Sequence, residues 1–423
     1  MSVVSAISEE LGLKGHLTES DRHLLAYSTT AHSLNHAVML SIPILVPIWV
    51  TEFGVTRYTL GLVVTAMAAL FGVTSLPAGV ISDRLGADTA IDLFLFGTGV
   101  ALLGVLAVDS FASLGLVVAL AGAGAGLYHS PALSLISRRA DEPSKGFAYH
   151  GLGANIGIGL GPLGVTVGLT FTDWRTLLVV LGASLVVFGF VFRLWGPDDP
   201  VESDDEVKAD ADGKSSLLGQ MSSFATVGFA AVVGVYIFAG MYYRGSLTFL
   251  PDFLNTVSSL PDLEVAGKEI ESGRWVYSTI LLIGSVGQIV GGNLGERFEV
   301  ETVLKGVYVA TSASFVVLGL GSGRWILAGG VAFGALLFTL PPLHSTVVTK
   351  YLPEDNRGVG FGLVFGINFG VGAVGAALAG WVLTQTGNNY GLMFFLLAVF
   401  PLGSLVSIIA LKRVSGGEPV VSM

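Results

Sequence analysis

The chain has 423 residues, of which 52% are hydrophobic and only 12% are charged, against about 25% charged residues in a typical soluble protein. Its 58 glycines follow no collagen-like repeat, and it has no cysteine for disulfides or thiolate metal ligands. Its formal net charge of −10 argues against binding to nucleic acid, which needs a basic surface. These numbers exclude a disordered chain, a fibrous chain and an ordinary soluble enzyme. They predict a polytopic membrane protein, in which glycine lets helices approach closely.

Polar and apolar stretches alternate along the chain. The first 23 residues are polar and mixed in charge, without a basic n-region or a cleavage pattern, so we expect no signal peptide. Twelve apolar runs follow, each long enough to cross a membrane as a helix. We expect these spans at 24–50, 58–80, 89–108, 111–137, 146–170, 175–195, 222–250, 274–295, 302–321, 324–349, 358–384 and 388–411.

Acidic residues gather in two of the breaks between spans. The break at 196–220 holds eight carboxylates against two lysines, and a second polar segment at 252–274 holds five acids against two basic residues. The first break divides the spans six and six, which predicts an all-α polytopic fold of two pseudo-symmetric six-helix halves. The expected parts are an N-terminal segment 1–23, a first half 24–195, an acidic linker 196–221, a second half 222–411 and a tail 412–423.

Lysine and arginine in the loops predict the orientation. With the N-terminus inside, fifteen of these residues fall in cytoplasmic segments or span ends and five in external ones, and Arg244 alone lies well inside a span. Cytoplasmic loops carry the excess of positive charge in most membrane proteins. We therefore expect a multi-pass protein of the cell membrane with both termini in the cytoplasm.

Short patterns recur between the two halves. An internal repeat with a long period is typical of a duplicated fold. Four pairs recur in the same order at offsets of 208 to 215 residues. The first pair is Gly79-Val-Ile-Ser-Asp83-Arg84 with Gly292-Asn-Leu-Gly-Glu296-Arg297, and the second is His129-Ser130 with His344-Ser345. In the third, Lys145-Gly146 matches Arg357-Gly358 and Asn155 matches Asn368. In the fourth, Pro43 matches Pro251, so that His36 and Arg244 take equivalent positions.

Two six-span halves around a linker are typical of a secondary transporter whose site lies near the midplane between repeats. The sequence Gly79-Val-Ile-Ser-Asp83-Arg84-Leu-Gly86 resembles the loop motif Gly-x-Leu-Ala-Asp-Arg-x-Gly of the major facilitator superfamily, and the resemblance covers residues 24–411. Three further patterns resemble its fosmidomycin-resistance type: the glycine-rich runs at 121–129 and 151–162, Ala31-His32-Ser-Leu-Asn35, and Arg244-Gly-Ser-Leu-Thr-Phe-Leu-Pro251. This resemblance implies the major facilitator fold and export.

The chain departs from that subfamily at two places. The subfamily usually has an acidic residue after the asparagine of span one, where this chain has His36. It also tends to have His-Pro-Glu in span four, where this chain has His129-Ser130-Pro131. The carboxylates expected to couple transport to protons are therefore missing, and proton-driven drug efflux does not carry over directly.

Arg244 is an intramembrane cation without a visible acidic partner in the sequence. Such a charge is costly and usually faces a cavity. Its forked donors suit an anionic substrate such as a carboxylate or a phosphonate. The alternative is that the side chain extends toward the outer interface, since Arg244 lies in the outer half of span seven.

His32 and His36 share one face of span one because they stand four residues apart. His36 lies roughly 18 Å into the span at 1.5 Å per residue. Because imidazole changes its charge near pH 6.5, both histidines are candidates for the missing proton carrier. Hydrogen bonding to substrate or to a neighbouring helix is the alternative. Metal ligation together with His129 is conceivable, but two histidines at helical spacing are weak evidence, so we expect neither a metal nor another cofactor.

The remaining candidates form two groups. The substrate-binding group is Arg244, His36, Tyr243, His129, Asn155, Asn368 and Asn35. For His129, Asn155 and Asn368 the alternative is hydrogen bonding between helices, which applies to His344 as well. For Tyr243 the alternative is an interfacial aromatic belt. The second group is a conformational latch in the two repeated loops, or else an ordinary solvated turn: Gly79, Asp83, Arg84, Gly86, Gly292, Glu296 and Arg297. The glycine runs at 122–126 and 157–161 predict close helix packing rather than phosphate binding.

These observations predict a secondary active transporter and not an enzyme. It would move a small organic anion or amphipathic compound through the lipid bilayer by alternating access, as a monomer, with export favoured and the proton as candidate coupling ion. Uptake of an anionic metabolite is the first alternative. An intramembrane metal or redox protein that uses the histidines is the alternative from a different class.

Overall fold

A computed structural model describes residues 18–195, 224, 226–257, 261–352 and 357–416. The expected acidic linker, most of the N-terminal segment and the last residues of the tail lie outside this range. Within it, twelve helical segments are long and apolar enough to cross a membrane. This confirms the prediction of an all-α fold with twelve spans. The spans are helical because lipid offers no hydrogen-bond partner to the backbone N–H and C=O groups, which therefore bond to one another within each helix.

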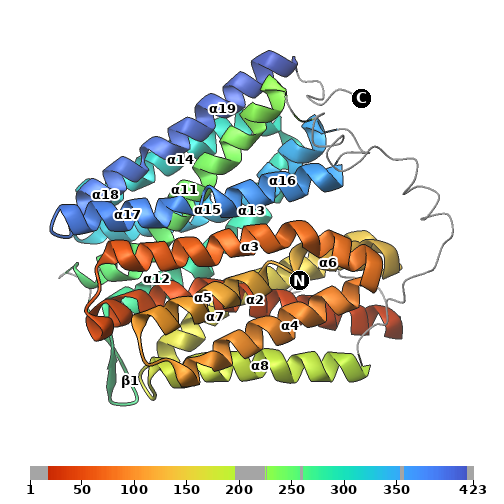
Figure 1. Cartoon of the computed structure of the whole chain (residues 1–423). Helices are drawn as coiled ribbons and strands as arrows, with labels where there is room; N and C mark the ends of the chain where they lie inside the picture. Colours follow the sequence, from red (N-terminus) through yellow and green to blue (C-terminus); the bar gives the residue numbers. More distant parts are fainter. Residues whose placement is uncertain (1–17, 196–223, 225, 258–260, 353–356, 417–423) are drawn as a thin grey trace, which may run out of the picture. The chain divides into compact units, whose positions relative to one another are not determined.

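Contacts divide the chain into two units, the first drawn from residues 1–41 and 73–201 and the second from residues 42–72 and 202–423. The helices that begin in the first half are α2 (Glu19–Phe53), α3 (Arg57–Leu85), α4 (Ala87–Leu103), the 3₁₀ turn η1 (Gly104–Ala107), α5 (Phe111–Ala125), α6 (His129–Arg139), α7 (Pro143–Gly168) and α8 (Trp174–Trp195). In the first unit α4 packs against α5, α6 and α8 (Figure 1).

The second half contributes α11 (Val227–Asn255), β1 (Leu263–Val265), β2 (Lys268–Ile270), α12 (Ser272–Gly284), α13 (Gly287–Arg297), α14 (Val300–Leu320), α15 (Arg324–Tyr351), α16 (Arg357–Gly370), α17 (Val374–Gln385), α18 (Tyr390–Leu397) and α19 (Val399–Ser415). In the second unit α11 packs against α17 and α19, and α14 packs against α15 and α19. Residues 42–72 belong here because the start of α3 packs on α17, where Thr65 donates to the Ala373 carbonyl at 2.9 Å.

Glycines set the spacing between α2 and α7. A Cβ atom added at Gly153, Gly157 or Gly161 would lie 2.2 to 2.5 Å from backbone atoms of Thr29, Ser33 or Ala37. The glycines stand four residues apart and line one face of α7. As the sequence predicted for the run at 157–161, they allow two helices to touch along their backbones.

Span four is interrupted in the middle, between the end of α5 at Ala125 and the start of α6 at His129. A break inside a span frees carbonyl groups that lipid cannot satisfy. Three side chains of α2 and α3 supply donors instead. Asn35 donates to the Ala125 carbonyl at 2.8 Å, Thr74 donates to that of Ala123 at 2.7 Å, and Ser75 donates to that of Gly126 at 3.1 Å. The break is therefore held at a fixed place.

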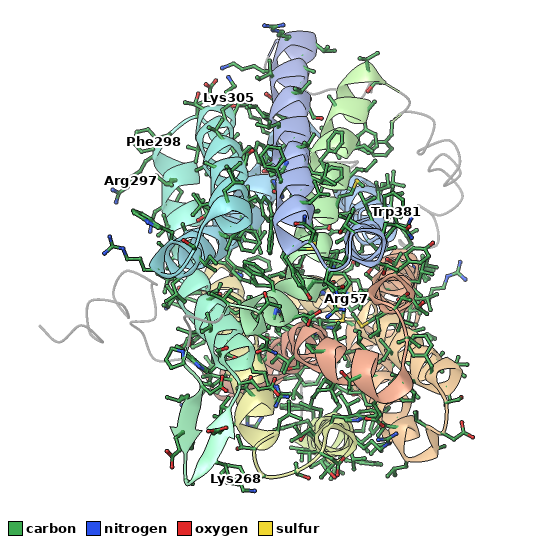
Figure 2. The ribbon with its side chains drawn as sticks, turned by 90° about the vertical axis from the view of Figure 1, so that its left-hand side faces the viewer. Arg57, Lys268, Arg297, Phe298, Lys305 and Trp381 are labelled. Atoms are coloured by element: carbon green, nitrogen blue, oxygen red, sulfur yellow. The ribbon has the colours of Figure 1, made fainter. Side chains whose placement is uncertain are left out.

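A small hairpin follows span seven. Strands β1 and β2 pair antiparallel, with Val265 opposite Lys268. The two turn residues, Ala266 and Gly267, have φ values of 51° and 73°, as the tightest hairpin turns require. The Trp275 indole donates to the Pro261 carbonyl at 3.2 Å and so ties the hairpin to α12. Figure 2 shows Lys268 at the hairpin's tip.

Span seven shows the largest difference from the sequence expectation. Its helix runs from Val227 to Asn255 rather than over 222–250. Asp252 was expected in a polar segment that begins at this residue, yet it lies within α11 and is only 6% exposed. The physical reason is that a carboxylate can remain inside a span when cations and hydroxyl groups surround it.

Candidate functional site

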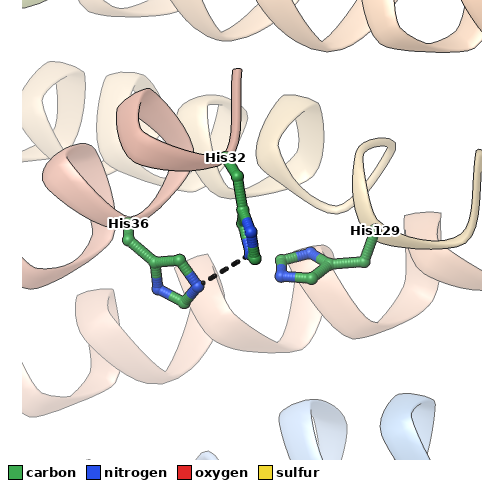
Figure 3. A group of neighbouring side chains, drawn as sticks. All are labelled: His32, His36 and His129. Atoms are coloured by element: carbon green, nitrogen blue, oxygen red, sulfur yellow. Dashed lines mark hydrogen bonds between the residues drawn. The ribbon is translucent and has the colours of Figure 1, made fainter. Parts of the chain in front are cut away.

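A cluster of imidazoles lies in the first unit. The Nε2 atoms of His32 and His36 are 3.1 Å apart, and the ring of His129 lies edge-on to both. Ligand atoms of these three residues all lie within 4.8 Å of one another. Figure 3 shows His32 between the other two. The structure thus brings together three of the histidines that the sequence singled out, two from α2 and one from the first position of α6.

Two further aromatic residues complete this cluster and were missed in the sequence. The ring of His150 from α7 stacks on His32, with centroids 3.8 Å apart, and its carbonyl lies 2.7 Å from Nδ1 of His32. The Tyr128 hydroxyl donates to the Ser28 carbonyl at 2.6 Å and lies 3.3 Å from Nδ1 of His150. The one sequence pattern that could have pointed to His150 is the glycine spacing after it, which predicts that α7 packs closely on another helix.

Arg244 lies in the interior of α11 and is only 8% exposed. Its guanidinium carbon is 4.6 Å from the ring centroid of Phe369 and 5.1 Å from that of Tyr243. Such cation–π contacts offset part of the cost of burying a charge. Among the described residues, no carboxylate lies within ion-pair distance of this guanidinium, and no side chain accepts a hydrogen bond from it. The site therefore presents a positive charge between two aromatic faces.

Several acidic side chains in or near the ends of other spans are paired with cations other than Arg244. In the first unit, Arg193 lies 3.3 Å from Asp92 and 3.6 Å from Asp88. In the second unit, Lys350 lies 2.6 Å from the fully buried Glu301. Arg193 thus pairs with two carboxylates and Lys350 with one, whereas Arg244 has no carboxylate partner among the described residues.

Repeat-related polar residues differ in what they contact. Asn368 donates to the Tyr236 carbonyl at 2.7 Å, and His344 shares a 2.8 Å hydrogen bond with the Tyr308 hydroxyl. Both therefore make the contacts between helices that were the alternative to a substrate role. Asn35 likewise donates to the break in span four. By contrast, the buried Oδ1 of Asn155 accepts no hydrogen bond from any described residue.

The sequence missed an ion-pair network in the second unit. Arg57 at the start of α3 donates to both carboxylate oxygens of Asp252 in α11, at 2.5 and 3.2 Å. It also donates to the Asn388 side chain at 2.9 Å and to the Tyr390 hydroxyl at 3.1 Å. Tyr390 in turn donates to Asp252 at 2.5 Å. Arg57 was expected in a loop, but Figure 2 shows it among the helices, while Arg297 and Phe298 project outward.

A pocket of about 610 Å³ also lies in the second unit. Its lining comes from the ends of α2 and α11 and from the start of α12, and it includes none of the residues predicted to bind substrate. The lining residues are Pro47, Ile48, Thr51, Glu52, Asn255, Asp262, Glu271, Ser272 and Arg274. Three carboxylates against one arginine make the pocket acidic, so it suits an anion poorly.

The predicted latch loops lie at helix ends. Gly86 separates α3 from α4 with φ of +93°, a conformation that favours glycine. Arg84, Glu296 and Arg297 are exposed, and the side chain of Asp83 lies outside the described part of the structure. A Cβ atom at Gly79 would meet the Ser130 hydroxyl at 3.6 Å, whereas one at Gly292 would meet nothing within 4 Å. The latch role stays a prediction.

Comparison with known proteins agrees with this architecture. The family model described as Major Facilitator Superfamily matches residues 29–268 and 270–421. The fosmidomycin resistance protein of Escherichia coli (strain K12) is 22% identical over 392 residues, which cover 91% of this chain and 92% of the relative. An uncharacterised MFS-type transporter of Bacillus subtilis (strain 168), YfnC, is 25% identical over 367 residues, which cover 84% and 85% of the two chains.

Solved structures show the same fold at low sequence identity. The nucleoside transporter NupG superposes with a TM-score of 0.72 at 16% identity, covering 92% of this chain and 99% of that one. A POT family transporter in complex with 5-aminolevulinic acid gives a TM-score of 0.71 at 14% identity, covering 96% and 98%. At such identities the likeness extends to the fold alone.

Proposed function

We propose that this chain, which belongs to the major facilitator superfamily of secondary transporters and not to an enzyme family, exports a small organic anion or amphipathic compound. Alternating access would carry the substrate across the cell membrane, with protons as the coupling ion. The protein would act as a monomer, its first half 24–195 moving against its second half 222–411 about the acidic linker 196–221.

One observation carries the choice of an anion. The guanidinium of Arg244 lies between the rings of Tyr243 and Phe369, buried and without an acidic partner in the described part of the chain. A cationic drug would be repelled by this charge, whereas a carboxylate or phosphonate would compensate it through paired hydrogen bonds. The aromatic faces on either side suit the apolar part of an amphipathic compound.

Orientation follows from the basic residues. The positive-inside pattern supports cytoplasmic termini, and it assigns the repeated loops around Gly79–Gly86 and Gly292–Arg297 to the cytoplasmic side. There they would latch the transporter in its outward-open state. The same topology assigns the Arg57–Asp252 network to the external side.

The histidine cluster supports proton coupling. His36 occupies the position where the resembling subfamily has an acid, and its ring contacts the rings of His32 and His129. His150, which stacks on His32, is the next titratable group. Because imidazole changes charge between about pH 5 and 8, His36→Gln is expected to flatten the pH dependence of transport over this range. An unchanged pH profile would remove His36 as the proton carrier.

Transport in liposomes tests the proposal. Purified protein would be reconstituted, a pH gradient imposed, and flux measured for a panel of carboxylates and phosphonates beside matched neutral and cationic compounds. The proposal expects flux of anions only, driven by the proton gradient. Selective flux of cations, or no dependence on the gradient, would contradict it.

Uptake of an anionic metabolite is the second candidate. The observation that favours it is the loss of the two carboxylates that the resembling subfamily carries near His36 and His129. The name of the Escherichia coli relative records resistance to a compound, and export is one route to resistance, so it supports the first candidate. The gradient direction that drives accumulation in vesicles of known sidedness distinguishes the two.

A further inference from the structure

The histidine cluster has the composition of a metal site. Among the described residues, His32, His36 and His129 are the group whose imidazole nitrogens come within 4.8 Å of one another. They belong to two separate helical elements, as Figure 3 shows. The sequence spacing placed two ligands on one helix and named His129 as a conceivable third without evidence that it lies near them. The structure adds the third from the broken span.

Hydrogen bonding fixes the tautomer of the central ring. Nδ1 of His32 lies 2.7 Å from the carbonyl oxygen of His150, and a carbonyl can only accept a hydrogen bond. Nδ1 of neutral His32 therefore carries the proton, and Nε2 carries a lone pair. Metal-binding histidines typically donate their second nitrogen to a carbonyl or carboxylate in this way.

The spacing of the nitrogens fits a small divalent ion. Two imidazoles on a tetrahedral zinc ion, with bonds of about 2.0–2.1 Å, hold their nitrogens roughly 3.3 Å apart. The Nε2 atoms of His32 and His36 are 3.1 Å apart. The largest separation within the group, 4.8 Å, would have to shrink by about 1.5 Å.

The surroundings hold the ligands in place. His150 stacks on His32, and Tyr128, which precedes His129, is anchored through its hydroxyl to the Ser28 carbonyl. Asn35 fixes the end of α5, and thereby the break after which α6 begins. These contacts hold the His32 ring and the start of α6 near the binding geometry, and the ion would draw the nitrogens closer.

We propose that His32, His36 and His129 bind one divalent first-row transition-metal ion, such as Zn²⁺ or Co²⁺, through their imidazole nitrogens. Imidazole ligands select such ions over Mg²⁺ and Ca²⁺, which prefer oxygen. Three protein ligands leave the fourth position to water or to an anion. An anion is the expected fourth ligand, because three neutral imidazoles leave the charge of the ion uncompensated and α6 begins there with the positive end of its dipole.

Metal titration of the purified protein tests this site. The full chain, with any polyhistidine tag removed, would be titrated with Zn²⁺ by calorimetry in detergent. We expect one ion per chain, and a loss of affinity of about tenfold or more in His36→Gln and in His129→Gln, since each removes one of three ligands. His23→Gln is the matched control, because His23 is an exposed histidine of the same helix α2.

A second measurement covers variants that fold poorly. Wild-type protein would be loaded with Co²⁺, whose visible absorption reports tetrahedral coordination, and X-ray absorption would count the imidazoles around the ion. Three imidazoles support the proposal. Two or fewer, no saturable binding, or equal affinity in His36→Gln and wild type would overturn it. Neither measurement involves flux, so a failed transport experiment leaves this result standing. A bound ion would occupy a nitrogen lone pair of His36, so metal binding would count against His36 as the proton carrier.

Discussion

Two arginines of the second unit have opposite surroundings. Arg57 donates to both oxygens of Asp252 and is further held by Tyr390 and Asn388. Arg244 is more deeply buried, yet it has aromatic rings beside it and no described carboxylate. Desolvating a charge is costly, and this contrast between a paired and an unpaired arginine is the basis of the proposal that an anionic substrate compensates Arg244.

The largest effect is expected from removing the uncompensated arginine. Arg244→Met keeps much of the side-chain volume, and it should lower anion flux by about 100-fold, since loss of a buried charge partner costs roughly 2–5 kcal/mol. Thermal stability in detergent should stay the same or rise, because an unpaired buried charge is gone. Arg244→Lys should retain part of the flux, and the exposed Arg324→Met should retain all of it. Wild-type flux in Arg244→Met would rule out a substrate contact.

Breaking the paired arginine should instead affect stability. Arg57→Met leaves Asp252 without its cation, and we expect a loss of about 2–3 kcal/mol, less than for a fully buried pair because the Arg57 side chain is 20% exposed. The measurement is the apparent melting temperature in detergent. In the double variant Arg57→Met with Asp252→Leu, part of the loss should be recovered. If the double variant is as unstable as the sum of both single ones, the pair contributes no coupling energy.

A smaller difference should separate the two repeat-related asparagines. Asn368→Leu removes a 2.7 Å hydrogen bond to the Tyr236 carbonyl and should cost about 1 kcal/mol of stability. The Oδ1 atom of Asn155 accepts no hydrogen bond from a described residue, so Asn155→Leu should cost less stability, while it lowers transport more. Melting temperature and flux, measured on both variants, check this pair. A reversed order in both readouts would assign the substrate role to Asn368.

The smallest effect concerns a charge stabilised by backbone donors. The Thr176 N–H donates to the Asp173 carboxylate at 2.9 Å just before α8, which holds the pKa of that carboxyl below its ordinary value. The carboxylate of Asp173 therefore stabilises the fold at pH values above its pKa in the unfolded chain. This stabilisation is lost as the pH falls through its lower pKa in the folded chain. Asp173→Ala should cost about 0.5 kcal/mol at pH 7, at the low end for helix caps because this carboxylate is exposed. Asp173→Asn should keep the cap but lose its pH dependence. Equal melting temperatures for both variants would contradict a capping role.

Sequence periodicity predicted the spans because the bilayer imposes long apolar helices. All twelve are confirmed, with small shifts at their ends. The end of span seven differed because Asp252 and Pro251 look like a loop when the partners of Asp252 are unknown. Those partners, Arg57 and Tyr390, lie 195 and 138 residues away along the chain, and no local pattern links them.

The candidate site was predictable in part. Arg244 was recognisable because a charge inside an apolar run is rare, and His32 and His36 because helical spacing places them on one face. The approach of His129 depends on a break in span four that glycines permit but do not specify. The contribution of His150 depends on how closely α7 packs on α2. The positions of His129 and His150 depend on contacts between helices, and the residue spacing within one helix does not predict such contacts.

The hairpin of β1 and β2 has a practical consequence. The chain contains no cysteine, so Lys268→Cys at the tip would be its only thiol. A maleimide dye or spin label would then attach at a single known position, on a short arm tied to α12 through Trp275. With a second label on one further cysteine in the other half, the distance between the two labels could be followed in real time through the transport cycle.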